Sequence, residues 1–254
     1  MKKYLLVIAC YNDARQDFFR QYTSPRNKEY CQQHNYEYLE LTSKLIPFRE
    51  NLTWNKISTV RDLLNENVLK DNDILVHLDA DMCLVKPELE YPCNKSFSYV
   101  IDSGNTHCMG NYSIKINDWS RQLLENILSE ERYQKFKNVL TIHEYFGTLS
   151  PFWEEFREQA SWYSLAGIKR HSNKPFWEYS DYGWHSTPFP EDTVYSLEEL
   201  YENVEVLPTE WNVTELEGES SCIFNINKVK KENVIIRHFA GGQPWRKEWF
   251  QKTN

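Results

Sequence analysis

The sequence has no C-x-x-C pair, although six cysteines are scattered over its 254 residues. In a domain of this size that pattern implies neither a zinc ribbon nor a disulfide framework, so we expect reduced, structural cysteines. Long apolar runs are missing too: residues 4–9 are apolar, far fewer than the ~20 residues needed to cross a bilayer. This run also lacks the features of a secretory signal. We therefore expect it to be a first strand and the protein to be cytoplasmic, with peripheral membrane association still open.

Basic residues are fewer than acidic residues. Lys and Arg number 29 against 37 Asp and Glu, which gives a formal net charge of −8. This balance argues against a broad nucleic-acid surface, so an anionic substrate would need locally concentrated cations or a metal. The chain also lacks internal repeats, low-complexity tracts and a clear linker. We therefore expect one domain, 1–254.

What the chain does have is an apolar run, residues 74–78, that leads directly into Asp79-Ala80-Asp81. The run is short, rich in β-branched residues and preceded by a polar stretch, which is typical of a buried strand. Two aspartates at the end of a central strand can converge on one cation, and hard oxygen ligands suit Mg²⁺ or Mn²⁺. The alternative is a solvated strand end, because aspartate is common in turns.

The remaining patterns indicate an α/β fold. Strands are expected at residues 4–10, 36–41, 97–102, 111–117, 204–207 and 234–238, and helices at 17–34, 57–68, 118–128 and 151–160. A further helix is expected to open at Glu191-Asp192. The strand–helix–strand start favours parallel pairing. Residues 170–190 are dense in proline and aromatics without any period, and we interpret them as an acceptor-side wall or lid.

Two strand-end motifs together resemble the metal-dependent retaining glycosyltransferases of the GT-A fold. One is Asp79-Ala80-Asp81, and the other is His238-Phe-Ala-Gly-Gly-Gln-Pro-Trp245. The second is similar to the His-Phe-x-Gly-Cys-Lys-Pro-Cys of glycosyltransferase family 34 and echoes a related motif of family 8. Three further stretches support family 34: Trp54-Asn55-Lys56, the block of residues 110–120, and Glu191-Asp192-Thr193.

The resemblance implies a GT-A fold: a Rossmann-like, mixed and mostly parallel sheet flanked by helices. It also implies retaining transfer of a hexose or pentose from a nucleotide sugar to a glycan or other acceptor. A UDP-linked donor is favoured and a GDP-linked donor is possible. It makes His238 a third metal ligand beside Asp79 and Asp81, and imidazole favours Mn²⁺ over Mg²⁺.

Further site residues follow from the strand-end rule and from the resemblance. Donor-binding residues are expected to be Cys10, Tyr11, Asn12, Lys56, Ala80, Gly241, Gly242 and Trp245. Asp192 and Gln243 are the expected catalytic residues. Asp192 has an alternative interpretation as a helix N-cap. Gln243 stands where the family has a lysine, and Thr193 stands where it has a glutamine.

Two other functions remain open. A non-catalytic protein of the same fold could bind nucleotide sugars or carbohydrate, which the departures at Gln243 and Thr193 would allow. A sugar-nucleotide pyrophosphorylase is the other. It would need a glycine-rich basic loop after the first strand, whereas residues 11–15 here read Tyr-Asn-Asp-Ala-Arg.

Overall fold

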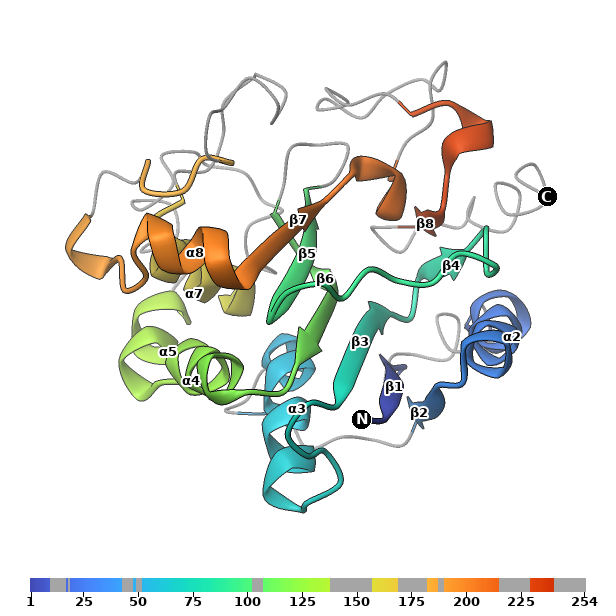
Figure 1. Ribbon diagram of the computed structural model, residues 1–254, viewed down its shortest axis with the longest axis horizontal. Helices are drawn as coiled ribbons and strands as arrows, with labels where there is room; N and C mark the ends of the chain where they lie inside the picture. Colours follow the sequence, from blue (N-terminus) through green and yellow to red (C-terminus); the bar gives the residue numbers. More distant parts are fainter. Residues whose placement is uncertain are drawn as a thin grey trace.

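The computed structural model describes residues 1–9, 17, 19–42, 48, 52–101, 107–137, 157–168, 182–186, 190–214 and 229–239. Its main feature is a six-stranded sheet in the order β2-β1-β3-β6-β5-β7 (Figure 1). The strands are β1 Lys3–Ile8, β2 Glu37–Leu41, β3 Ile74–Asp79, β5 Phe97–Ile101, β6 His107–Lys115 and β7 Val204–Leu207. Only β6 runs against its neighbours in this sheet. The predicted mixed, mostly parallel sheet is therefore confirmed.

Helices flank the sheet, and most lie near their predicted positions. The α-helices are α2 Ser24–His34, α3 Asn55–Asn65, α4 Asp118–Ile127, α5 Glu130–Phe136, α7 Arg157–Ala166 and α8 Leu197–Asn203. A π-helical turn, Phe19–Thr23, precedes α2, and Pro25 sits in the first turn of α2, where its missing N–H is not needed.

Strict alternation in the strands builds two cores, one on each face of the sheet. In β1, Leu6 faces α3, α4 and α7, whereas Leu5 and Val7 face α2. Because successive side chains of a strand point to opposite faces, both faces of β1 must be apolar to be covered. Figure 1 shows α3, α4 and α5 grouped on the side of the sheet away from α2.

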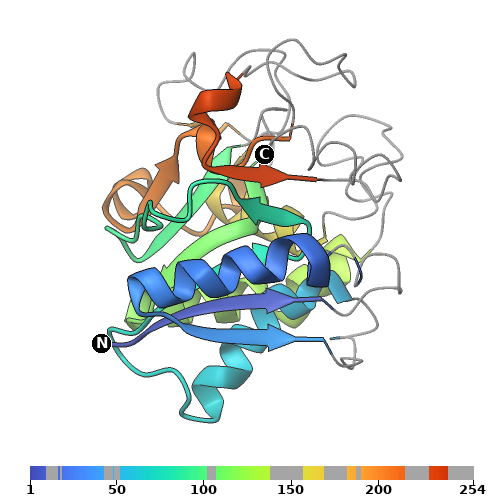
Figure 2. The ribbon, with the colours of Figure 1, turned by 90° about the vertical axis from the view of Figure 1, so that its right-hand side faces the viewer.

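A second, two-stranded sheet lies beside the main one. It pairs β4 Met82–Leu84 with β8 Ile236–His238 in antiparallel fashion, and the two strands lie side by side in Figure 2. The last strand was predicted, but β4 was not, because three residues are too few to show alternation. This small sheet matters for function since it joins the region after β3 to the C-terminal part of the chain.

Two predicted helix boundaries were wrong. Of the helix expected at 151–160, the structure describes residues from Arg157 onward, and this helix, α7, extends to Ala166. Glu191 and Asp192 do not open α8; they belong to a 3-10 turn, Pro190–Asp192, and α8 starts after Ser196, whose hydroxyl accepts the Glu199 N–H at 3.1 Å. Asp192 is therefore not the N-cap.

Three other expectations concern the lid, the cysteines and the membrane. Of the predicted lid, the structure describes only 182–186 and residue 190. Among the described cysteines, Cys31, Cys83, Cys93 and Cys108 are free. No helix within the described ranges combines the length and apolarity needed to cross a bilayer.

Candidate metal and donor site

The three predicted metal ligands converge. Asp79 is the last residue of β3, Asp81 precedes β4, and His238 is the last residue of β8. One ligand atom from each lies within 4.8 Å of the others, and His238 Nε2 is 3.5 Å from Asp81 Oδ1. Two carboxylates and an imidazole form a ligand set that can hold a divalent cation such as Mn²⁺.

Backbone pairing brings the C-terminal histidine to the aspartates. In the small sheet, His238 is paired with Met82, and the Phe239 N–H donates to the Asp81 carbonyl at 2.9 Å. On the other edge of β8, the His238 N–H donates to the Val213 carbonyl at 2.9 Å. Because both edges are hydrogen-bonded, the position of His238 is fixed by main-chain geometry rather than by its side chain alone.

Asp79 is held from two sides. Lys56 Nζ lies 2.8 Å from its Oδ2, and His77 Nε2 lies 3.2 Å from its Oδ1. Burial alone would raise the pKa of Asp79, but the Lys56 ammonium and the His77 hydrogen bond together hold that pKa below its ordinary value. Burial lowers the pKa of His77, so its imidazole is neutral and donates Nε2–H to the carboxylate. Asp79 is thus ionised and oriented.

Gly110 makes room for this arrangement. It lies in β6, next to Asn111, which pairs with Leu78 of β3. A Cβ atom at Gly110 would stand 2.3 Å from Asp79 Oδ2 and 3.1 Å from Met82 Cε. Only glycine allows the Asp79 carboxylate to lie against β6 and reach Lys56.

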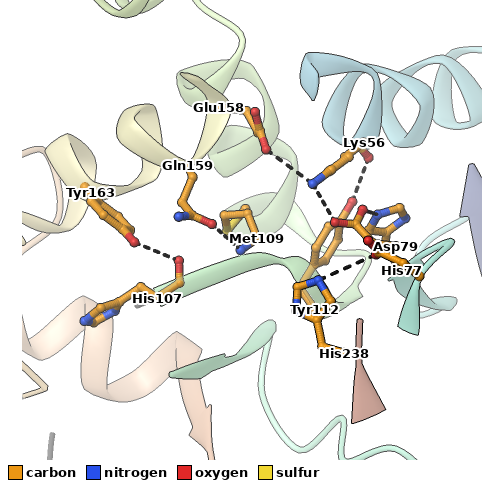
Figure 3. Close-up of polar contacts among 11 residues, drawn as sticks. Lys56, His77, Asp79, His107, Met109, Tyr112, Glu158, Gln159, Tyr163 and His238 are labelled. Atoms are coloured by element: carbon orange, nitrogen blue, oxygen red, sulfur yellow. Dashed lines mark hydrogen bonds and ion pairs between the residues drawn. The ribbon is translucent and has the colours of Figure 1, made fainter. Parts of the chain in front are cut away.

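Two residues that the sequence did not single out complete this region, as Figure 3 shows. Glu158, in the first turn of α7, places Oε1 3.6 Å from Lys56 Nζ. Its side chain is 2% exposed, and burial raises its pKa. Next to it, Gln159 accepts the Met109 N–H at 2.9 Å through Oε1. Within the described part of the chain, Glu158 Oε2 and Gln159 Nε2 have no hydrogen-bond partner.

These two residues carry a weak signal in the sequence. Glu158 and Gln159 lie in the first turn of α7, in which every residue from 158 to 166 is buried. Such a helix shows no amphipathic period, so a polar pair at its start does not stand out. The available signal is a Glu-Gln pair directly followed by the apolar and small residues of 160–166.

Of the other predicted site residues, the structure describes Ala80 and Asp192. Ala80 is buried beside the metal ligands, and its carbonyl accepts the Thr23 hydroxyl at 3.0 Å. Asp192 forms an ion pair with Lys135 of α5, and its carbonyl accepts a hydrogen bond from Arg132 at 3.2 Å. The rest lie outside the described residues and stay predictions: Cys10, Tyr11, Asn12, Gly241, Gly242, Gln243 and Trp245.

Asp192 and Glu158 lie at opposite ends of α7. The Val194 N–H donates to the Leu165 carbonyl, and Arg132, which contacts Asp192, also bonds Ser164. Leu165 lies seven positions after Glu158 in this helix, a rise of about 10 Å. Of the two acids, Glu158 is the one connected to Asp79, through Lys56.

Comparison with known proteins identifies the fold. No protein-family model matches the chain, and no curated protein matches its sequence. Among solved structures, it is similar to "a glycosyltransferase involved in the glycosylation of the major capsid of PBCV-1". The TM-score is 0.51 at 12% identity, over 100% of this chain and 98% of that one.

A second solved structure, the catalytic domain of Drosophila β1,4-galactosyltransferase 7 in complex with xylobiose, matches less well. The TM-score is 0.34 at 12% identity, over 50% of this chain and 52% of that one. The full-length match, together with the sheet and helices described above, shows that the chain has the GT-A glycosyltransferase fold.

Proposed function

We propose that the protein is a retaining glycosyltransferase that transfers a hexose or pentose from a nucleotide sugar, preferably UDP-linked, to a glycan. The observation that carries the proposal is the convergence of Asp79, Asp81 and His238 at a strand end of a GT-A fold. Ligands of α/β sheets bind outside the carboxyl ends of the strands, where these groups lie. Retention, the donor sugar and the cytoplasmic location rest on the sequence alone.

The proposed chemistry divides between a metal and the protein. When bound by the three ligands, Mn²⁺ would neutralise the negative charge that develops on the departing diphosphate. Lys56 keeps a second positive charge next to this site, because its ammonium lies within ion-pair distance of both Asp79 and Glu158. His77 keeps the Asp79 carboxylate in position.

The side of α7 that bears Glu158 and Gln159 is the proposed place of the donor sugar. Sugar hydroxyls need both acceptors and donors, and these side chains offer a carboxylate oxygen and an amide N–H that are not used within the described residues. We favour Glu158 over Asp192 as the acid beside the reacting sugar, because Asp192 lies at the far end of α7.

A donor screen tests this proposal. Thermal shifts would be measured with UDP- and GDP-sugars, with and without Mn²⁺, and each active donor would then be assayed for hydrolysis and transfer. We expect Mn²⁺-dependent stabilisation by a UDP-sugar, with the shift lost in Asp81→Ala, and turnover with retention of the anomeric configuration. Mn²⁺-dependent UDP binding without turnover of any sugar would instead identify a non-catalytic binding protein.

A further inference from the structure

Lys56 lies between two carboxylates, and only one of them belongs to the metal ligands. Its Nζ is 2.8 Å from Asp79 Oδ2 and 3.6 Å from Glu158 Oε1. The side chains of Lys56 and Asp79 are both 16% exposed, so water screens their attraction only partly. Figure 3 shows the ammonium pointing into the space between the two acids.

A metal ion that binds the Asp79 carboxylate has to compete with the Lys56 ammonium. Both oxygens of the Asp79 carboxylate already accept an N–H, from Lys56 at one and from His77 at the other. His77 is fully buried within the sheet, and its ring packs against Tyr112 with centroids 5.2 Å apart, so it has no room to withdraw. Lys56 reaches the site on a long side chain from the first turn of α3 and is the group that can move.

Glu158 offers Lys56 a second position. Its carboxylate is already within ion-pair distance, and its Oε2 has no hydrogen-bond partner among the described residues. A short rotation of the lysine side chain toward α7 would exchange one carboxylate for the other. A buried carboxylate without a counter-charge is costly, so this exchange would also stabilise ionised Glu158.

We propose that Lys56 is an internal cation that competes with the divalent metal for Asp79, and that Glu158 receives the Lys56 ammonium when the metal binds. This inference rests on the metal site of the proposed function. It makes metal affinity a property of the Lys56–Glu158 pair as well as of the ligands.

The test is a titration of the purified protein with Mn²⁺, without nucleotide, in which electron paramagnetic resonance reports free Mn²⁺. We expect Lys56→Met to bind Mn²⁺ at least about fivefold more tightly than wild type, in the range of ordinary coupling energies. Damage to the fold would weaken binding, so a gain in affinity is not explained by a structural defect. Lys2→Met, which removes the exposed ion pair with Glu37 at the start of β1, should leave the affinity unchanged.

A double-mutant cycle separates exchange from simple charge repulsion. If Glu158 acts through Lys56, Glu158→Gln weakens Mn²⁺ binding in the wild-type background but has little effect beside Lys56→Met. Equal weakening in both backgrounds would mean that Glu158 acts as a distant charge, and this would overturn the exchange.

The outcomes also distinguish this inference from the proposed function. Mn²⁺ binding by wild type that is unchanged or weakened in Lys56→Met would overturn the competition while leaving the metal site in place. Absence of binding in both proteins would overturn the competition together with the metal part of the proposed function. Binding by Lys56→Met alone would support the competition in its strongest form.

Discussion

At the scale of single residues, the site depends on how the Asp79 carboxylate is held. A neutral imidazole, a lysine ammonium and a missing Cβ act on the same two oxygen atoms. None of these groups needs to touch the substrate. His77 and the space at Gly110 fix the direction of the carboxylate before a ligand arrives, as partners behind metal ligands commonly do, whereas Lys56 holds the carboxylate only until a metal binds.

Gly110→Ala tests this fixed direction. The added methyl group would lie 2.3 Å from Asp79 Oδ2, so the carboxylate must turn away. We expect Mn²⁺ affinity to fall about 10- to 100-fold, the usual effect of a lost supporting contact, while the circular dichroism spectrum stays that of the wild type. Unchanged affinity would show that the Asp79 orientation does not limit metal binding.

Glu158 gives the stability of the protein a distinct pH dependence. Burial raises its pKa in the folded state above the ordinary value of 4.5, so the folded protein retains a proton that the unfolded chain releases. The stabilisation is complete below pH 4.5 and is lost as the pH rises toward the folded-state pKa. Asp79, whose pKa is lowered, acts in the opposite direction and below pH 3.8.

Denaturant unfolding of wild type and Glu158→Gln at several pH values checks this dependence. We expect the stability of Glu158→Gln relative to wild type to increase as the pH rises above 4.5, by at most ~1.4 kcal/mol per pH unit. A difference between the two proteins that is constant across this range would contradict the raised pKa of Glu158.

At the scale of elements, the small sheet decides whether His238 reaches the aspartates. Val213 pairs with Arg237 of β8, and the chain just before Val213 is hydrogen-bonded to Asn111 of β6 in the main sheet. The Asn111 side chain donates to the Trp211 carbonyl at 2.5 Å and accepts the Tyr91 hydroxyl at 2.6 Å. Asn111 is fully buried, so these bonds connect β6 to the segment beside β8 without competition from water.

Asn111→Leu tests that connection. Loss of the side-chain amide leaves two polar partners unsatisfied, which should destabilise the fold by about 1–3 kcal/mol and weaken Mn²⁺ binding about tenfold by displacing β8. Asn203→Leu is the matched control, because Asn203 bonds Ser96 and the Glu199 carbonyl away from the metal ligands. Equal Mn²⁺ affinity in the two variants would show that Asn111 supports stability only.

The elements also show what the sequence could predict. Apolar runs and alternation located β1, β2, β3, β5, β7 and the second half of β6, because local patterns determine such strands. β4 was missed since its pairing with β8 joins residues more than 150 positions apart. In the site, the strand-end aspartates and His238 were found through motifs. Glu158, Gln159 and His77 belong to no motif and act only through contacts that the fold creates.

At the scale of the whole molecule, two acids, Glu158 and Asp192, lie at opposite ends of α7, and on the proposed function the donor sugar can adjoin only one of them. At saturating Mn²⁺, we expect Glu158→Gln to lower kcat/KM for the donor at least about 100-fold, as removal of a group acting at the reacting centre does. Asp192→Asn should remain close to wild type. The reverse result would restore Asp192 to the catalytic role that the sequence resemblance suggests.

The most direct test of the account is the position of the ion. Crystals grown with Mn²⁺ and UDP would be measured at a wavelength where manganese scatters anomalously. We predict one anomalous peak among the side chains of Asp79, Asp81 and His238, which is lost in crystals of Asp81→Ala. A peak elsewhere in the protein, or density for His238 turned away from an ion bound by the aspartates alone, would contradict the proposed site.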